Sequence, residues 1–166
     1  MESMHKLRRM DKAIAESSAV KAILHEAKFI TLALSLNDEP YLATLSHGFD
    51  EEKNCIYFHC AKEGRKIDIM MANPRVWGQA LIDGGYQQGS CDHLYRTAQF
   101  HGSVSFVNDS SEKKHALEVL IRHLDENPEA VIAKQITATS LDRVRIGRVD
   151  IDFLSGKKAD KIIVQL

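Results

Sequence analysis

The sequence predicts a small antiparallel β-barrel with helices packed on its outside. Three strand-like apolar runs, residues 29–36, 41–49 and 55–59, are separated only by short polar turns, which is typical of a β-meander. Helical patterns occur at irregular places between the strands, so a doubly wound parallel sheet is not expected. A length of 166 residues, 44% of them hydrophobic, suits one domain with a real core, and we expect a single domain over residues 1–166.

The N-terminal segment, residues 1–28, is expected to be helical in its second half and to pack on the barrel. Hydrophobic residues recur there at spacings of three and four, which gives a helix over residues 17–28 one apolar stripe. The stripe consists of Val20, Ile23, Leu24 and Ala27.

The remainder of the chain mixes helices with longer strands. Asp109, with Glu112 three residues later, is an N-cap signature, and Asn127 with Pro128 ends one helix and begins another. In chain order we expect a helix over 64–73, a strand over 75–82, a loop over 83–92, a strand over 95–107, the helix after Asp109, a helix from 128 to about 135, a strand over 141–153 and a short strand over 162–166.

Charge and cysteine content argue against several classes of protein. Lys plus Arg number 22 and Asp plus Glu 23, so the net charge is −1 and no global positive field attracts nucleic acid. The first ten residues lack the apolar stretch of a secretory signal, and no window approaches the roughly 18 apolar residues of a membrane helix. Three cysteines cannot all pair internally, which favours free thiols and a cytoplasmic location. We expect neither nucleic acid nor a membrane among the partners.

The densest chemical signal lies where the third predicted strand ends and a helix begins. Lys62, Arg65 and Lys66 gather three cations there against one carboxylate, that of Glu63. A helix start has unpaired N–H groups and partial positive charge, so this segment suits a phosphate group. It is neither a P-loop nor a dinucleotide glycine fingerprint. A solvated helix start with ordinary surface charges explains the same residues, and both interpretations stay open at this point.

The same segment carries a family resemblance. Its pattern Phe-His-x-Ala-x-x-Gly-x-Lys, residues 58–66, resembles the flavin-binding proteins related to pyridoxamine 5′-phosphate oxidase, most closely the branch named for nitroimidazole resistance. The likeness extends from about residue 8 to 158 through short motifs in the expected order. They are Thr31-Leu32-Ala33-Leu34, Glu39-Pro40-Tyr41, Asn73-Pro74-Arg75-Val76, Tyr95-Arg96-Thr97 with Gly102, Glu112-Lys113 with Ala116-Leu117, and Ser155-Gly156-Lys157.

The resemblance implies a fold, a cofactor and a partner. The implied fold is mainly β with α: an antiparallel split β-barrel that binds FMN and carries peripheral helices. The implied assembly is a homodimer with FMN in clefts between the subunits, acting on a small-molecule substrate. Carried over by position, the phosphate is held by Arg65 and Lys66, and Gly64 lets the backbone approach it. The strand beside the ribityl chain and phosphate ends with Phe58, His59 and Cys60.

The resemblance also assigns the ring side of the cofactor. Thr44, Leu45 and Ser46 pass the isoalloxazine ring, whose polar rim can pair with the N–H and C=O groups of a strand edge. Thr97 reaches the ring by its hydroxyl. The sequence departs from the branch where Thr44 replaces a proline and Ile30 a glycine. It also lacks the arginine- and tryptophan-bearing tail of true pyridoxamine phosphate oxidases, which argues against that substrate.

Several residues have competing interpretations. His59 is a strand histidine bonded to its neighbours, a phosphate or ribityl contact, or a proton donor beside the flavin. Cys91, His93 and His101 match no paired metal-ligand spacing, so we predict no metal site. Cys60 is expected as a packed barrel thiol. Trp77 is expected in the core or at the dimer interface.

The predicted function is that of an FMN-dependent oxidoreductase that reduces small, electron-poor substrates of the nitro type. The protein positions the flavin and sets access and polarity, while the cofactor supplies the chemistry. No dedicated catalytic acid or base is evident. A flavin carrier or sensor without turnover, a haem-linked protein of the same fold, and a deazaflavin in place of FMN stay open as alternatives.

Overall fold

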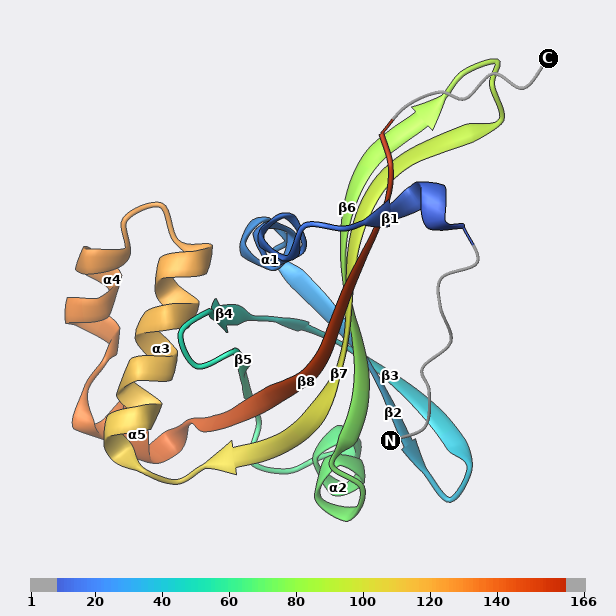
Figure 1. The fold of residues 1–166 in the computed structure, drawn as a ribbon. Helices are drawn as coiled ribbons and strands as arrows, with labels where there is room; N and C mark the ends of the chain where they lie inside the picture. Colours follow the sequence, from blue (N-terminus) through green and yellow to red (C-terminus); the bar gives the residue numbers. More distant parts are fainter. Residues whose placement is uncertain (1–8, 161–166) are drawn as a thin grey trace.

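The structure is a computed structural model that describes residues 9–160 of the chain. Its eight strands form one antiparallel sheet in the order β3-β2-β6-β7-β8-β5-β4, and β1 pairs with β8 beside this path (Figure 1). The strands are β1 (Ala13–Ile14), β2 (Phe29–Leu36), β3 (Glu39–Ser46), β4 (Gly48–Asp50), β5 (Cys55–Cys60), β6 (Arg75–Gln87), β7 (Asp92–Val107) and β8 (Arg145–Ala159).

The helices lie around the sheet. A 3-10 turn η1 (Met10–Lys12) leads into β1, α1 (Ser17–Glu26) packs against β7, β6 and β4, and α2 (Arg65–Ala72) packs against β2. On the opposite side, α3 (Ser110–Leu124) lies against β4 and β5, and α4 (Pro128–Gln135) and α5 (Ala138–Arg143) lie against α3 (Figure 1). None of the helices in residues 9–160 is both long and apolar enough to cross a bilayer.

The barrel is split between β3 and β5. In the described residues β3 pairs only with β2, over Phe29–Leu36 opposite Glu39–Ser46. β5 pairs with β8 along its whole length, but with β4 only over Cys55–Tyr57. The last residues of β5 therefore have one free edge, and β3 touches β5 across this gap without a ladder of hydrogen bonds. The expected antiparallel split barrel with peripheral helices is confirmed.

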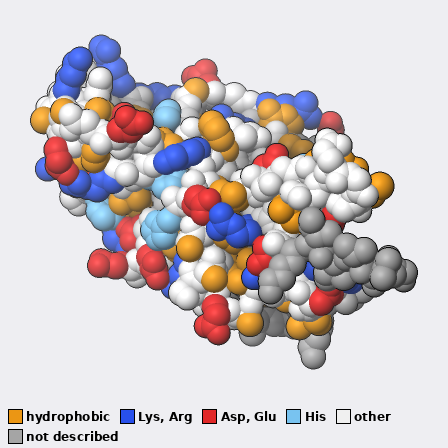
Figure 2. Space-filling model, turned by 90° about the horizontal axis from the view of Figure 1, so that it is seen from above, with side chains coloured by type: hydrophobic (Ala, Val, Ile, Leu, Met, Phe, Trp, Pro, Cys, Tyr) orange, Lys and Arg blue, Asp and Glu red, His pale blue; other side chains and the backbone are white. Residues whose placement is uncertain are grey.

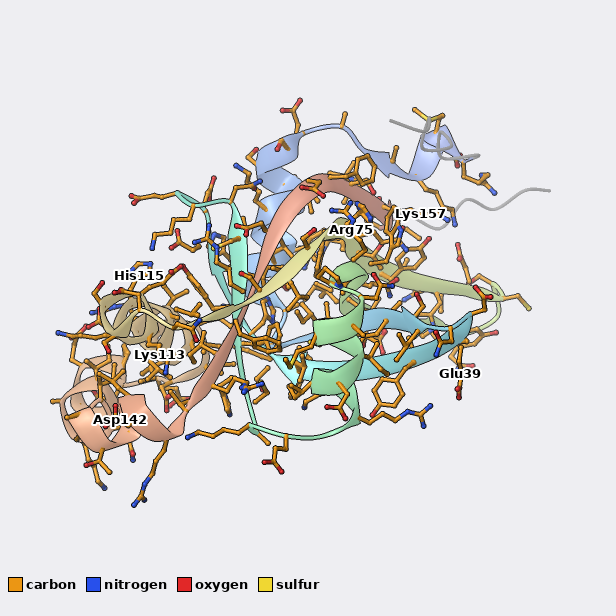
Figure 3. The ribbon with its side chains drawn as sticks, turned by 90° about the horizontal axis from the view of Figure 1, so that it is seen from below. Glu39, Arg75, Lys113, His115, Asp142 and Lys157 are labelled. Carbon is orange, nitrogen blue, oxygen red and sulfur yellow. The ribbon has the colours of Figure 1, made fainter. Side chains whose placement is uncertain are left out.

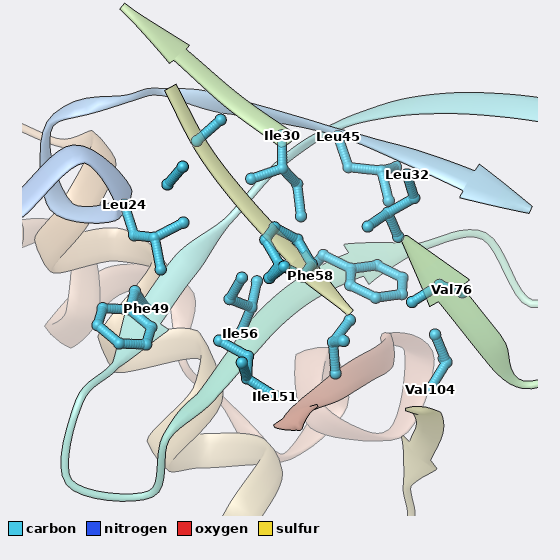
Figure 4. Packing of buried hydrophobic residues seen from close by; sticks show 14 of the residues in the cluster. Leu24, Ile30, Leu32, Leu45, Phe49, Ile56, Phe58, Val76, Val104 and Ile151 are labelled. Carbon is cyan, nitrogen blue, oxygen red and sulfur yellow. The ribbon is translucent and has the colours of Figure 1, made fainter. Parts of the chain in front are cut away.

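The core fills the barrel and extends under α1. Alternation along β2 sends Ile30, Leu32 and Leu34 inward and leaves the intervening residues outside. Phe58 is fully buried at the centre of this cluster (Figure 4). Its ring lies flat on its cross-strand partner Gly147, where an added Cβ would come within 2.1 Å of the ring. A glycine on β8 therefore makes room for the phenylalanine on β5.

Most predicted elements are confirmed with shifts of a few residues at their ends. The helix after residue 17 ends at Glu26, and strand 29–36 is observed with those bounds. The Asp109 carboxylate accepts a hydrogen bond from the Glu112 backbone N–H, as its N-cap role requires, and Pro128 opens α4.

Three predictions about the elements are wrong. The expected loop 83–92 is mostly strand, because β6 and β7 continue to Gln87 and from Asp92 as a long ribbon with a register shift at Asp83 and Gly85. The expected strand 141–153 begins later, at Arg145, because a Thr137–Ser140 capping box starts the short helix α5 before it. The run 41–49 is broken at His47 into β3 and β4. The strand expected at 162–166 lies outside the described residues.

Candidate functional site

The start of α2 is an uncapped helix N-terminus beside the split. Gly64 occupies the N-cap position with φ +134°, and no side chain accepts from the first N–H groups of the helix. The first backbone bonds of the helix run from the Ile67 and Asp68 N–H groups to the Gly64 carbonyl. The N–H groups of Arg65 and Lys66 thus have no partner from the helix itself. An added Cβ at residue 64 would meet nothing, so its φ, not its surroundings, favours glycine.

Arg65 and Lys66 leave the first turn of α2 toward different strands. The Arg65 guanidinium donates to the Glu39 carboxylate at 2.9 Å and lies 5.0 Å from the centroid of the Tyr41 ring, so it reaches the start of β3. Both partners of this pair are more than half exposed, which makes the pair weak. Figure 3 shows Glu39 at the outer end of the β2–β3 hairpin, with α2 between it and the Asp142 side of the molecule.

Lys66 lies on the side of α2 that faces the end of β5. Its side chain is partly buried, and its positive charge acts to lower the pKa of the Cys60 thiol. Burial raises the pKa of Cys60, and the positive charges of Lys66 and Arg145 oppose this rise. The thiol donates to the Arg145 carbonyl, with 3.8 Å between sulfur and oxygen. Cys60 is therefore a packed thiol, as expected, with two cations beside it.

At the ends of β3 and β5, some side chains point into the core and others point outward. Leu45 and Phe58 are buried in the core, so only their backbones can face a ligand in the split. Thr44 and His59 are exposed, and Ser46 is partly exposed. The Thr44 hydroxyl lies 3.1 Å from that of Thr31 on the neighbouring strand. The α2 start thus follows shortly after the end of β5 at Cys60, and Arg65 links it to the first residues of β3 through Glu39 and Tyr41.

Thr97 does not join this group within one subunit. It lies on β7, three strands away from β3 in the sheet order, or about 14 Å at the usual strand spacing. Its side chain is nearly buried, and its hydroxyl donates to the Lys157 carbonyl at 3.3 Å. A molecule that touches both Thr44 and Thr97 must lie across the outer face of the sheet or between two copies of the chain.

Two neighbouring rows on the outer face of the sheet contain no Lys, Arg, Asp or Glu and are partly apolar, although Arg75 contacts His101 at the border of the first row. Residues in register there form the row Leu42, Ala33, Trp77, His101 and Phe153, and beside it the row Thr44, Thr31, Gln79, Gln99 and Ser155. Leu42 is 68% exposed, Phe29 59% and Leu81 52%. Trp77 is 43% exposed, so its expected place in the core is wrong and the interface alternative remains.

A polar cluster that binds α3 to the barrel escaped the sequence analysis. The Tyr57 hydroxyl donates to Glu112 at 2.9 Å, and the Arg148 guanidinium donates to the same carboxylate at 2.7 Å. Beside them, His115 lies 2.6 Å from Asp50. Burial raises the pKa of the Tyr57 hydroxyl, and Glu112 adds to this rise. The partners are far apart in sequence, so no local pattern signals the cluster, and we assign it to anchoring α3.

Three histidines meet at the C-terminal end of α1. His47, which is fully buried, donates through Nε2 to the Leu24 carbonyl at 2.9 Å. His123 donates in the same way to the Ala27 carbonyl at 2.8 Å, and the two rings lie 4.8 Å apart between centroids. The His25 ring lies tilted against that of Phe49, with 5.1 Å between the ring centroids. Figure 2 shows histidine side chains gathered on this side of the molecule. The imidazoles thus supply partners for carbonyls that the helix end leaves free.

The residues considered for a metal are not brought together. Cys91 and His93 lie at the tip of the β6–β7 ribbon, where His93 contacts Asp83 at 2.7 Å. His101 lies eight residues further along β7, roughly 26 Å away at the rise of a strand, in contact with Arg75. Within residues 9–160 no three His, Cys, Asp or Glu side chains are placed to hold a metal ion together.

Comparison with known proteins identifies the family. The sequence profile described as pyridoxamine 5′-phosphate oxidase matches residues 16–158, and the chain therefore belongs to that family. A comparison with curated proteins gave no match.

Solved structures share the fold at low sequence identity. A candidate 5-nitroimidazole antibiotic resistance protein from Bacteroides thetaiotaomicron is 24% identical with a TM-score of 0.74, over 88% of this chain and 86% of the other. The flavocytochrome Anf3 from Azotobacter vinelandii is 15% identical with a TM-score of 0.82, over 100% and 78%. An FAD-binding protein from Mesorhizobium loti is 22% identical with a TM-score of 0.66, over 90% and 98%.

Proposed function

We propose that the protein is an FMN-dependent oxidoreductase that reduces small, electron-poor substrates of the nitro type. The observation that carries the proposal is the uncapped, cation-bearing start of α2, which follows shortly after the end of β5 and contacts the start of β3 through Arg65 and Glu39. A terminal phosphate suits the helix start, and a planar ring with a polar rim suits a strand edge. Family membership supports a flavin, and the names of the Bacteroides and Mesorhizobium proteins support the substrate class and the flavin.

The residues that surround this site fit the cofactor in separate roles. Lys66 and Arg65 neutralise the phosphate, and Gly64 keeps the helix start open to it. The backbones of residues 44–46 pair with the rim of the ring, and the exposed His59 lies where the ribityl chain passes. A flavin held by these residues would supply hydride acceptance from a reductant and electron donation to the substrate. No side chain of the site is required as an acid or base for that exchange.

The preference for FMN over FAD is testable by titration. A cluster that closes on a terminal phosphate should bind FMN more tightly than FAD, whose second phosphate bears an adenosine. We expect tighter binding of FMN when flavin fluorescence is followed against protein concentration. Equal or tighter binding of FAD would contradict the assignment of the α2 start as a terminal-phosphate site.

Absorbance spectra distinguish the three candidate functions, which are an oxidoreductase, a flavin carrier and a haem-linked protein. Adding NADH or NADPH without oxygen should bleach the flavin absorbance of an oxidoreductase, and a nitroaromatic acceptor should then restore it. Flavin that keeps its colour indicates the carrier. An intense Soret band in the purified protein indicates the haem-linked alternative.

We propose further that the protein is a homodimer that closes the site. The outer face exposes the large apolar side chains of Leu42, Phe29 and Trp77, and apolar patches on small proteins mark contact surfaces. Thr97 lies too far from β3 to complete the same site within one subunit, so a second copy offers it the shorter route to the ring.

A charge placed on this face tests the dimer. Leu42→Lys puts an ammonium group within the proposed contact, where burial without a partner costs several kcal/mol. We expect light scattering to show a dimer for the wild type and a monomer of 18.7 kDa for the variant, with weaker FMN binding. Met71→Lys, an equally exposed position on α2, is the control and should remain dimeric. A monomeric wild type at micromolar concentration would contradict the shared site.

A further inference from the structure

The C-terminal ends of α1 and α3 are bonded to each other in both directions. The His123 imidazole of α3 donates to the Ala27 carbonyl at 2.8 Å, and the Lys28 ammonium donates to the His123 carbonyl at 2.7 Å. Between β3 and β4, His47 donates to the Leu24 carbonyl of α1 at 2.9 Å, and its ring lies 4.8 Å from that of His123. These bonds, called here the α1–α3 contact, attach the end of α3 through two imidazoles.

A second attachment holds the start of α3 on the barrel, and it is rich in carboxylates. Glu112 accepts from the Tyr57 hydroxyl at 2.9 Å and from the Arg148 guanidinium at 2.7 Å. His115 lies 2.6 Å from the nearly buried carboxylate of Asp50. A proton on His115 forms an ion pair with that carboxylate, so mild acid preserves this attachment.

The α1–α3 contact offers no such partner to a protonated His47. The groups within residues 9–160 whose charge acts most on its ring are His123, His25 and Lys28, all of them cationic when protonated. The ring is fully buried, and its Nδ1 has no hydrogen-bond partner in the described residues. A proton on Nδ1 therefore creates a buried cation beside other cations, with no acceptor for its new N–H group.

The acids on the outer side of this contact are engaged elsewhere. Glu51 bonds to Lys21 and His25 of α1, and Glu129 of α4 is paired with Arg122 of α3. A hollow in the surface gives water access to the contact from this side. It is lined by His25, Phe49, Val119, Arg122 and His123.

The segment after the middle of α3 is loosely held apart from the α1–α3 contact. Leu120 is the last buried residue of α3, and no residue of α4 is buried. α4 lies on the side of α3 that faces away from the sheet and is tied to it through Arg122 and Glu129 (Figure 1). Segments with few buried contacts open at a low free energy, so residues 121–135 are suited to move as a unit.

We propose that mild acid detaches residues 121–135, the end of α3 together with α4, from α1, while the start of α3 stays on the barrel. His123 leaves the Ala27 carbonyl, and the protonated His47 gains a route to water past the space that the His123 ring occupied. The movement requires neither a flavin nor a second subunit, so it is independent of the proposed function.

The direction of the pH effect follows from the burial of both rings. Burial lowers the pKa of His47 from 6.5 to about 4, and it also lowers that of His123. In the detached form His47 regains its ordinary pKa, so between pH 6.5 and 4 this form binds a proton that the closed form does not. Detachment is therefore expected to be about 20-fold more frequent at pH 5 than at pH 7.

Hydrogen–deuterium exchange of the full-length protein measures this detachment. Exchange rates at pH 7 and pH 5, divided by the intrinsic rates at the same pH, give the opening frequency of each segment. In the wild type, residues 121–135 should open about 20-fold more often at pH 5, and more often than β5 at both pH values. His47→Gln keeps a donor for the Leu24 carbonyl but cannot titrate, so it should lose most of this increase, and His123→Gln should lose a smaller share. His115→Gln, on the same helix but at the other attachment, is the matched control and should show the wild-type increase.

The proposal fails if the acid increase is the same in His47→Gln as in the wild type. It also fails if residues 121–135 and β5 open equally often at pH 5, since the protein then opens as a whole. Circular dichroism shows whether each variant folds. If His47→Gln does not fold, the comparison is made with His123→Gln, in which an undiminished increase overturns the proposal.

Discussion

Replacing Lys66 with Ala is expected to weaken FMN binding roughly 10- to 150-fold. This is the effect of losing a charge-assisted contact of about 1.5 to 3 kcal/mol to the phosphate. Lys66 is partly buried at the uncapped start of α2, where solvent screens its charge less than that of a fully exposed lysine. Riboflavin should bind the wild type far more weakly than FMN does, and it should be nearly indifferent to the substitution. Fluorescence titration of both flavins measures these differences.

Two further variants complete the comparison. Arg65→Ala should weaken FMN in the same phosphate-dependent way, but by less, because the wild-type guanidinium has to leave Glu39. Lys134→Ala removes an exposed cation from α4, outside the 62–66 segment, and serves as the control, with FMN affinity close to that of the wild type. The fold should survive each change, since trimming a surface side chain at a helix start costs little. If Lys66→Ala weakens FMN and riboflavin equally, the segment is only a charged helix start.

Local patterns predict the first half of the barrel well, because each of its signals spans neighbouring residues. The alternation along residues 29–36 places the strand and its inward face, and Asp109 marks a helix start by its own hydrogen bond. Where pairing between distant strands sets the bounds of an element, the local sequence patterns give the wrong bounds. Gly84 and Gly85 suggest a loop, yet β6 and β7 pair across them as a ribbon. Residues 141–144 suggest strand, but the capping box of α5 and the register of β8 with β7 and β5 set its start at Arg145.

In the candidate site too, the residues that are adjacent in the chain could be predicted from the sequence, and those brought in from distant segments could not. The motif over residues 58–66 identifies the helix start and its cations because they are adjacent in the chain. Phe58 belongs to this motif and the resemblance assigns Leu45 to the ring, yet the pleat of their strands turns both side chains into the core. Glu39 lies far from the motif in sequence, and only its contact with Arg65 at the start of α2 shows that the first residues of β3 lie beside this helix. Thr97 lies on β7, three strands from β3 in the sheet order, and this separation also is set by long-range pairing.

A buried histidine, His47, directly follows the residues proposed to contact the flavin ring. His47 follows Ser46 directly, and its ring is buried against α1 and His123. A carbonyl can only accept a hydrogen bond, so the contact with Leu24 fixes the proton on Nε2. Nδ1 is then an acceptor that finds no partner in the described residues. Burial lowers the pKa of His47 from 6.5 to about 4, so the folded protein keeps this ring neutral in mild acid.

The stability of the protein is therefore expected to fall as the pH drops from about 6.5 to about 4. In this window the unfolded chain binds a proton at His47 and the folded protein does not, so protonation favours unfolding. The contribution of His47 is fully present above pH 6.5, and its complete loss amounts to roughly 3 kcal/mol. His123, whose pKa burial also lowers, adds a smaller share.

Urea unfolding at a series of pH values between 7 and 4.5 measures this loss. His47→Gln keeps an amide donor for the Leu24 carbonyl but cannot titrate, so its free energy of unfolding should depend less steeply on pH than that of the wild type by up to one proton. His123→Gln should reduce the steepness by less. Equal slopes for wild type and His47→Gln would show that the ring is not held neutral. Because the backbone before His47 forms the proposed flavin edge, the same acid step should release FMN from the wild type at a higher pH than from His47→Gln.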